Sequence, residues 1–153
     1  MEHAKDHIIN IIRDLPFFDE FTLEEVKRFA RNLSLQHIDE GAFLFREGDV
    51  GDYLFFVVEG LVEIIMESSS KSQKIIASYG PGASIGEMAL IDEFERSASV
   101  RAATDCEILV LTKSRFETTL KEQPEVGTKL LKGLARNISL RLRSQQGLFH
   151  DIS

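Results

Sequence analysis

The hydrophobic pattern changes after Leu33, and this change limits the possible folds more than any other feature of the sequence. Before it, apolar side chains recur at helical spacing; after it, they form short runs separated by turns that contain glycine or proline. Runs of this kind are typical of a compact β-region. We expect strands at Leu35–Ile38, Phe43–Phe45, Tyr53–Glu59, Leu61–Glu67, Lys74–Tyr79, Ala98–Ala102 and Glu107–Leu111.

Helical patterns precede the β-region. Residues 1–13 place apolar side chains near one face at helical spacing, and Pro16 is expected to end this helix. Thr22 followed by Glu25 forms a capping box, which predicts the start of a second helix. The buried face of that helix is expected to carry Val26, Phe29, Ala30 and Leu33.

Two more helices are predicted after the β-region. Thr112 is expected to cap the first, and Pro124 to open the last, which runs to Gln146 and is followed by a tail over residues 147–153. The last helix also concentrates positive charge, at Lys129, Lys132, Arg136, Arg141 and Arg143. Such positive charge would suit a helix that binds nucleic acid. We favour the alternative that it forms the exposed face of a helix packed on an acidic body, because such a face also carries cations.

Length and charge restrict the class of protein. The chain has 153 residues, of which 43% are hydrophobic, and this suits a single domain over residues 1–153. The formal net charge of −7 argues against broad affinity for nucleic acid or anionic membranes. Cys106 is the single cysteine, so an internal disulfide cannot form. The sequence shows neither a signal peptide nor an apolar run of the roughly 18 residues that a membrane span needs, and a cytoplasmic location is expected.

The stretch Ser84–Val100 contains residues suited to an anion site. Gly86 allows the backbone to approach a ligand closely. One helical turn at Met88–Ile91 would direct free N–H groups, near Ala89, at negative charge. The backbone of this stretch is therefore expected to contact an anionic ligand.

Charged side chains in the same stretch indicate what the ligand contains. Arg96 offers a planar fork of donors to two phosphate oxygens, beside the hydroxyl and N–H of Ser97. Glu87 would repel a phosphate, so it suits another part of the ligand, such as a sugar hydroxyl. A ribose joined to a phosphate meets both demands. The alternative is that Glu87 and Arg96 pair only with each other across a solvated loop.

Residues 86–90, followed at this spacing by residues 96–100, resemble the phosphate-binding cassette of cyclic nucleotide-binding domains. The resemblance implies that Glu87 holds the ribose 2′-hydroxyl and that Arg96 pairs with the cyclic phosphate. It also implies that backbone N–H groups of the short helix complete the cradle. The implied ligand contacts are Gly86, Glu87, Met88, Ala89, Arg96, Ser97 and Ala98.

The resemblance covers about residues 15–145, because residues 53–64 are also similar to the paired central strands of the family. It implies an α+β, mainly β fold, in which an eight-stranded antiparallel β-roll or jelly-roll barrel lies between N-terminal helices and a C-terminal helical pair. The expected parts are helices in 1–33, the β-roll in 34–111 with the cassette at 84–100, and helices in 112–146.

The resemblance further implies a cyclic nucleotide sensor that signals through its last helix. Ser97 resembles the serine of cAMP-binding bacterial regulators, so cAMP is expected, with cGMP as the other candidate. Gln145 and Gln146 align where polar side chains meet the base, and they are candidates for a lid that gains order on binding.

Partners follow from the same resemblance. We expect a homodimer along the last helix or an effector protein, with neither a membrane nor nucleic acid as a direct partner, because no helix-turn-helix module follows up to Ser153. Two alternatives stay open. One is an interaction module of the same fold that binds no nucleotide, and the other is the ligand-binding part of a transcription regulator.

Catalysis, a cofactor and a metal ion are not expected. The histidines, which would be the first candidates for a metal site, are scattered, and the sequence shows no carboxylate at ligand spacing; they are His3, His7, His37 and His150. No local signature suggests a serine–histidine or cysteine–histidine pair. The sequence therefore predicts a binding protein rather than an enzyme.

Overall fold

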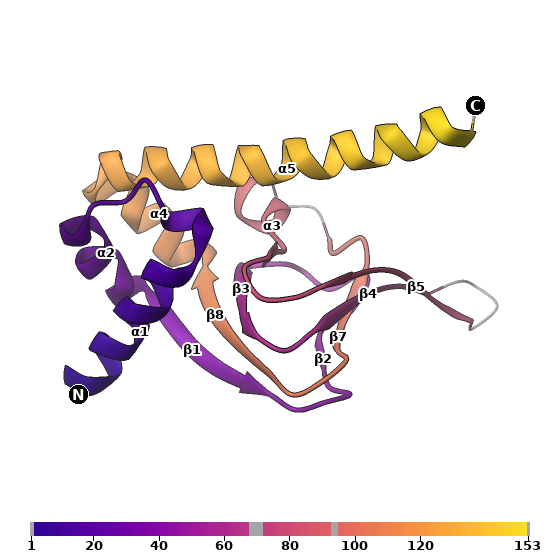
Figure 1. Cartoon of the computed structure of the whole chain (residues 1–153), viewed down its shortest axis with the longest axis horizontal. Coiled ribbons are helices and arrows are strands. Elements are labelled where there is room, and N and C mark those ends of the chain that lie inside the picture. The colour runs from indigo at the N-terminus through magenta and orange to yellow at the C-terminus, as the bar shows by residue number, and fades with distance from the viewer. Residues whose placement is uncertain (1, 68–71, 93–94, 153) are drawn as a thin grey trace.

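Eight antiparallel strands and a set of helices make up the computed structural model, which describes residues 2–67, 72–92 and 95–152, and the side chains of 6–67, 72–92 and 95–144. The strands form two four-stranded sheets, ordered β1-β8-β3-β6 and β2-β7-β4-β5. Their bounds are β1 (Leu33–Ile38), β2 (Phe43–Phe45), β3 (Tyr53–Glu59), β4 (Val62–Glu67), β5 (Gln73–Tyr79), β6 (Ser84–Ile85), β7 (Ser99–Ala102) and β8 (Cys106–Thr112). The α+β class and the eight-stranded antiparallel β-roll predicted from the sequence are confirmed (Figure 1).

The predicted strands match seven of the eight, within two residues at each end. The exception is β6, which has only two residues and pairs through Ser84 with Phe56 and through Ile85 with Phe55 of β3. A run this short shows no alternation of apolar and polar residues, so the hydrophobic pattern could not predict it.

Helices lie before, within and after the roll. They are α1 (Glu2–Asp14), η1 (Pro16–Phe18), α2 (Leu23–Phe29), η2 (Ala30–Asn32), α3 (Met88–Ile91), α4 (Lys113–Glu122) and α5 (Pro124–Ile152). The capping box is confirmed, because Thr22 N donates to Glu25 Oε1 at 2.9 Å and Glu25 N donates to Thr22 Oγ1 at 3.2 Å. Thr112 caps α4 as predicted, accepting from Arg115 N at 3.2 Å.

The last helix is longer than predicted. α5 continues to Ile152 instead of ending at Gln146, so the prediction of a tail over residues 147–152 is wrong. Gly147 lies inside the helix, and a single glycine costs about 1 kcal/mol there without ending it. Figure 1 shows α5 running from the helical end of the molecule across α3.

The core has two parts that meet at β3 and β8. Leu54 and Phe56 of β3 face the helices, where Phe56 packs against Phe18 with 5.1 Å between ring centroids. Phe55 and Val57, which alternate with them, belong to the cluster inside the roll. A strand buried on both faces explains why residues 53–58 form a continuous apolar run.

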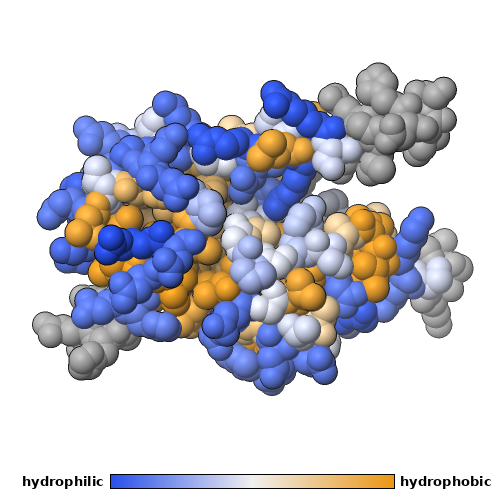
Figure 2. Space-filling view, in the orientation of Figure 1, coloured by the Kyte–Doolittle hydropathy of each residue, from blue (hydrophilic) through white to orange (hydrophobic). Residues whose placement is uncertain are grey.

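The first half of α5 is anchored in the helical part of the core. Val126, Leu130 and Leu134 are buried there, and a Cβ added at Gly133 would lie 2.5 Å from the Phe17 ring. Farther along, Leu140 and Leu142 are exposed. Figure 2, in the same orientation, shows a mostly hydrophilic surface along α5. No helix in the described part of the chain is long and apolar enough to cross a membrane.

Candidate functional site

The described part of the cassette predicted from the sequence contains β6, α3, the residues 95–98 and the start of β7. Gly86 lies between β6 and α3 with φ +86°, a conformation that L side chains rarely adopt. A Cβ added here would lie 2.6 Å from Arg96 Nη1. Glycine is therefore required at this position for the arginine to reach the backbone.

Arg96 is a buried cation held by backbone carbonyls. Its side chain lies over the Phe45 ring, 3.9 Å from the centroid, and the residue is 7% exposed. Nη2 donates to Tyr53 O at 2.6 Å and Nη1 donates to Gly86 O at 3.3 Å. Burial lowers the pKa of Arg96, although a guanidinium keeps its charge in proteins. The guanidinium is thus fixed in place by β3 and by the turn before α3.

Glu87 is the second buried charge, with 3% exposure. Its Oε1 accepts from Nη1 of Arg141, a residue of α5. Burial raises the pKa of Glu87 more than the charge of Arg141 lowers it. The alternative in which Glu87 pairs only with Arg96 is wrong, because Glu87 pairs with α5 instead.

Two polar atoms of the cassette are buried and have no hydrogen-bond partner among the described residues. They are Nε of Arg96 and Oε2 of Glu87. Buried polar groups in native proteins are nearly always bonded, so such atoms indicate a place where a ligand or water binds. One atom is a donor on a cation and the other an acceptor on an acid, which matches a ligand that carries both an anion and a hydroxyl.

α5 contacts the cassette through two residues that sequence reasoning did not select for the site. Asn137 Nδ2 donates to Ser84 Oγ at 2.6 Å, and Arg141 Nη2 donates to Ser84 O. The Arg141 guanidinium also lies 5.1 Å from the centroid of the Tyr79 ring. Asn137 and Arg141 are four residues apart, so they share one helix face. That spacing was the only available signal.

The other predicted ligand contacts differ in how far they are buried. Ala89 is buried, but its N–H donates to Gly86 O at 3.1 Å, so the prediction of a free N–H group here is wrong. This bond joins residues three apart, as in a 3-10 turn, so the N–H group is used within the turn itself. Met88 is 56% exposed, Ser97 is exposed and Ala98 is half-buried. The side chains of Gln145 and Gln146 lie outside the described residues.

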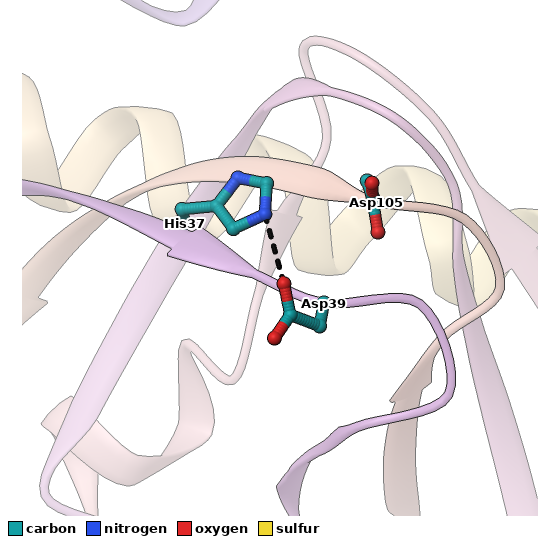
Figure 3. A group of neighbouring side chains, drawn as sticks. All are labelled: His37, Asp39 and Asp105. Carbon is teal, nitrogen blue, oxygen red and sulfur yellow. Dashed lines mark hydrogen bonds and ion pairs between the residues drawn. The ribbon is translucent and has the colours of Figure 1, made fainter.

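One histidine has carboxylates near it, contrary to the prediction. His37 lies with Asp39 and Asp105 so that one ligand atom of each falls within 4.8 Å of the others (Figure 3). The sequence did not show this because Asp105 is distant from His37 in the sequence, directly before β8. Nδ1 of His37 already contacts Glu107 Oε1 at 2.9 Å, and this bond raises the pKa of His37. All three residues are exposed, so the group has the form of a solvated ion cluster.

Cations of α5 pair with acidic groups of the body. Lys129 lies 2.5 Å from Glu25, and Arg136 lies 3.6 Å from Glu20. Together with Arg141, these contacts account for three of the five basic residues that the sequence concentrates in this helix. This agrees with the interpretation of a basic helix on an acidic body.

Comparison with known proteins identifies the same segment. The sequence model of the cyclic nucleotide-binding domain matches residues 35–123. The cyclic AMP receptor protein of Thermus thermophilus is 32% identical over 123 residues, which cover 80% of this chain and 57% of that protein. A cyclic nucleotide-gated potassium channel of Mesorhizobium japonicum is 34% identical over 116 residues, which cover 76% of this chain and 31% of the channel.

A solved structure agrees with these relatives. The crystal structure of a cyclic nucleotide-binding domain from Methylobacillus flagellatus superimposes with a TM-score of 0.84 at 30% identity, covering 97% of this chain and 84% of that one. The chain spans between about a third and just over half of the two relatives named above. Its matching segment, its fold and its cassette lead to one conclusion: the chain belongs to the cyclic nucleotide-binding domain family.

Proposed function

We propose that the cassette binds a cyclic purine nucleotide and that the protein is a regulatory module rather than an enzyme. The observation that carries this proposal is the pair of buried, unpartnered atoms, Nε of Arg96 and Oε2 of Glu87, in a chain of this family. Arg96 would neutralise the cyclic phosphate through a charge-assisted bond, and Glu87 would accept from the ribose 2′-hydroxyl. Backbone groups of Gly86 and Ser97 would line the remaining side.

cAMP is the ligand we favour over cGMP. Ser97 follows the phosphate-binding arginine directly and is exposed, so its hydroxyl is free to add a phosphate contact. A relative that is 32% identical is named a cyclic AMP receptor protein. A competition assay tests the preference: labelled cAMP should be displaced at lower concentration by cAMP than by cGMP, and the reverse order would change the assignment.

The response to the ligand is proposed to pass through α5. This helix contacts Glu87 from outside the cassette through Arg141. A change at the ribose carboxylate therefore reaches α5 directly, without an intermediate element. The downstream partner would be a second copy of the chain along α5 or an effector protein.

Titration calorimetry of the intact chain with cAMP tests the proposal. Arg96→Leu should weaken binding roughly 100-fold, because truncating one partner of a buried charge pair costs about 2–5 kcal/mol. Arg96→Lys should restore only part of this, since lysine lacks the planar fork. Arg46→Leu is the matched control, because Arg46 also lies over an aromatic ring, that of Phe43 at 4.0 Å, but is far more exposed.

The ribose contact has its own test. The parent protein should bind cAMP more tightly than 2′-deoxy-cAMP, whereas Glu87→Gln should distinguish the two ligands much less. Equal affinity of the parent for both would contradict the role of Glu87.

A second function is favoured by one observation. Both terminal nitrogens of Arg96 already donate to backbone carbonyls, as they would if the arginine served only to hold the fold. The chain would then be an interaction module that binds no nucleotide. Absence of heat with both cAMP and cGMP at millimolar concentration, together with a large loss of stability in Arg96→Leu, would support this alternative.

A further inference from the structure

One short segment, residues 45–53, contacts Arg96 at both its backbone and its side chain. This segment runs from the end of β2 to the start of β3. Arg96 N donates to Asp49 O at 2.8 Å, and Gly48 N donates to Arg96 O at 2.8 Å. The side chain reaches the same segment, because Nη2 donates to Tyr53 O at 2.6 Å. The connection between the two strands therefore holds the arginine at both ends.

Phe45 supports one face of the guanidinium. Cζ of Arg96 lies 3.9 Å from the centroid of the Phe45 ring and 5.1 Å from that of Tyr53, and the two rings pack edge to face at 6.2 Å. Tyr53 is fixed in turn, because its hydroxyl donates to Leu44 O at 2.8 Å. A cation is attracted to the face of an aromatic ring, and more strongly where water is excluded, as around this 7% exposed arginine. The rings thus restrict the orientation of the guanidinium plane.

Gly51 leaves room for the same side chain. A Cβ added at this position would lie 2.6 Å from Arg96 Nε, 2.8 Å from Arg96 Cζ and 2.8 Å from the Cβ of Ala89 in α3. The φ of Gly51 is not in the left-handed region, so the backbone conformation does not require glycine here. The close passage of the loop beside Arg96 and α3 requires it instead.

We propose that Phe45 and Gly51 are positioning residues for nucleotide binding. Phe45 fixes the plane of the Arg96 guanidinium, and Gly51 keeps the space beside α3 that the guanidinium occupies when it pairs with the phosphate. This inference rests on the proposed function of Arg96. Its physical basis is preorganisation, because a long side chain that packing already immobilises loses little conformational entropy on binding. Both residues lie outside the cassette, which the sequence placed at residues 84–100.

Titration calorimetry with cAMP tests the role of Phe45. Phe45→Leu should bind about two- to tenfold more weakly than the parent, the factor expected when one flexible side chain has to be immobilised on binding. Phe45→Tyr keeps the aromatic face and should bind within about twofold of the parent. Phe43→Leu is the matched control, because Phe43 lies on the same strand with Arg46 over its ring at 4.0 Å, and its loss should leave the affinity unchanged. Equal effects of the two leucine variants would overturn the assignment.

Two glycines of the loop separate the positioning of Arg96 from the folding of the loop. Gly51→Ala should weaken cAMP binding roughly tenfold, because the added methyl group displaces the guanidinium from its charge-assisted bond to the phosphate. Gly48 has φ +90°, and a Cβ added there would meet nothing within 4 Å. Gly48→Ala should therefore lower the stability to urea and leave the affinity nearly unchanged. An equal loss of affinity in both variants would overturn the role given to the space at Gly51.

Nuclear magnetic resonance of the protein alone tests the orientation of Arg96 without a nucleotide. The ring current of Phe45 should shift the side-chain proton signals of Arg96 upfield. Phe45→Leu should remove this shift, and Phe43→Leu should not. Removal of the shift with unchanged affinity for cAMP would overturn the positioning role while the proposed function stands. A shifted signal in a parent protein that gives no heat with cAMP or cGMP would instead contradict the proposed function, so the two failures are distinguishable.

Discussion

Two buried glutamates contact basic residues of α5, one near the beginning of the helix and one in its second half. Glu25 is 5% exposed and lies 2.5 Å from Lys129, and Glu87 is 3% exposed and contacts Arg141. The two pairs have the same chemistry and similar burial. They differ in how completely each carboxylate is bonded.

Among the described residues, Glu25 has no buried side-chain atom that lacks a hydrogen-bond partner, whereas Glu87 has one. Lys129 and the N–H of Thr22 both donate to Glu25, and the bond to Lys129 is the main reason that the pKa of Glu25 is lowered. Glu87 keeps one oxygen without a partner among the described residues, and burial raises its pKa. Hydrogen bonds to a carboxylate stabilise its ionised form, whereas burial without enough donors destabilises that form. The first pair therefore anchors α5, whereas the second leaves one oxygen of Glu87 available to a further donor.

The largest expected effect that separates the two pairs is on stability. Lys129→Met should lower the free energy of unfolding by about 2 kcal/mol, because it leaves Glu25 buried without its cation; the side chain of Lys129 is 28% exposed, which reduces the usual cost of about 3–5 kcal/mol. Arg141→Met should lower it by less than about 1 kcal/mol, since the end of α5 can move and let water reach Glu87. Urea unfolding measures both. Equal losses would mean that the two pairs play the same structural role.

The second effect is smaller and concerns pH. The pKa of Glu25 is lowered from 4.5, so its contribution to stability is present above pH 4.5 and is lost as the pH falls through the lower, folded value. The pKa of Glu87 is raised from 4.5, so its contribution is present below pH 4.5 and is lost as the pH rises through the higher, folded value. The two residues thus act in opposite directions.

Unfolding free energies measured between pH 3 and 8 check this difference. Glu25→Gln should make the loss of stability at acid pH shallower than in the parent. Glu87→Gln should instead raise stability at neutral pH relative to pH 4. Changes of the same sign in both variants would contradict the contrast drawn between the two carboxylates.

Part of the environment of Glu25 could be predicted from neighbouring residues in the sequence, but the contact between Glu87 and Arg141 could not. Thr22 and Glu25 are three residues apart, so the capping box that orients Glu25 could be predicted from the sequence. The partner of Glu87 is 54 residues away in the sequence and comes from a different element. Periodicity places Arg141 on a helix face, but it does not say which strand that face meets.

The cassette itself was predictable for a related reason. Gly86, Glu87 and Arg96 lie within eleven residues, and their order carries the resemblance to the family. Contacts that depend on the whole fold were not predictable, such as the carbonyl of Tyr53 on Arg96 or the approach of Asp105 to His37. The glycine inside α5 likewise misled the placement of its end, because a helix ends only where its last carbonyls find other partners.

The smallest expected effect concerns Asn137, which contacts the cassette one helical turn before Arg141. Asn137→Ala removes one neutral hydrogen bond, to Ser84 Oγ at 2.6 Å, whose net worth is about 0.5–1.5 kcal/mol. Because this bond holds α5 on the cassette and the segment around it is weakly attached, its loss should appear in ligand binding, as an affinity for cAMP about twofold weaker than the parent, and hardly in unfolding. Ser139→Ala, an exposed position of the same helix, should change neither quantity.

A double-mutant cycle with Ser84→Ala decides whether this bond is the cause. If it is, Asn137→Ala should have no further effect on cAMP affinity in the Ser84→Ala background, because the shared contact is already lost. An undiminished loss of affinity there would mean that Asn137 acts on the nucleotide by another route, as a direct ligand contact. Unchanged binding in the single variant would mean that the bond between Asn137 and Ser84 does not influence the ligand.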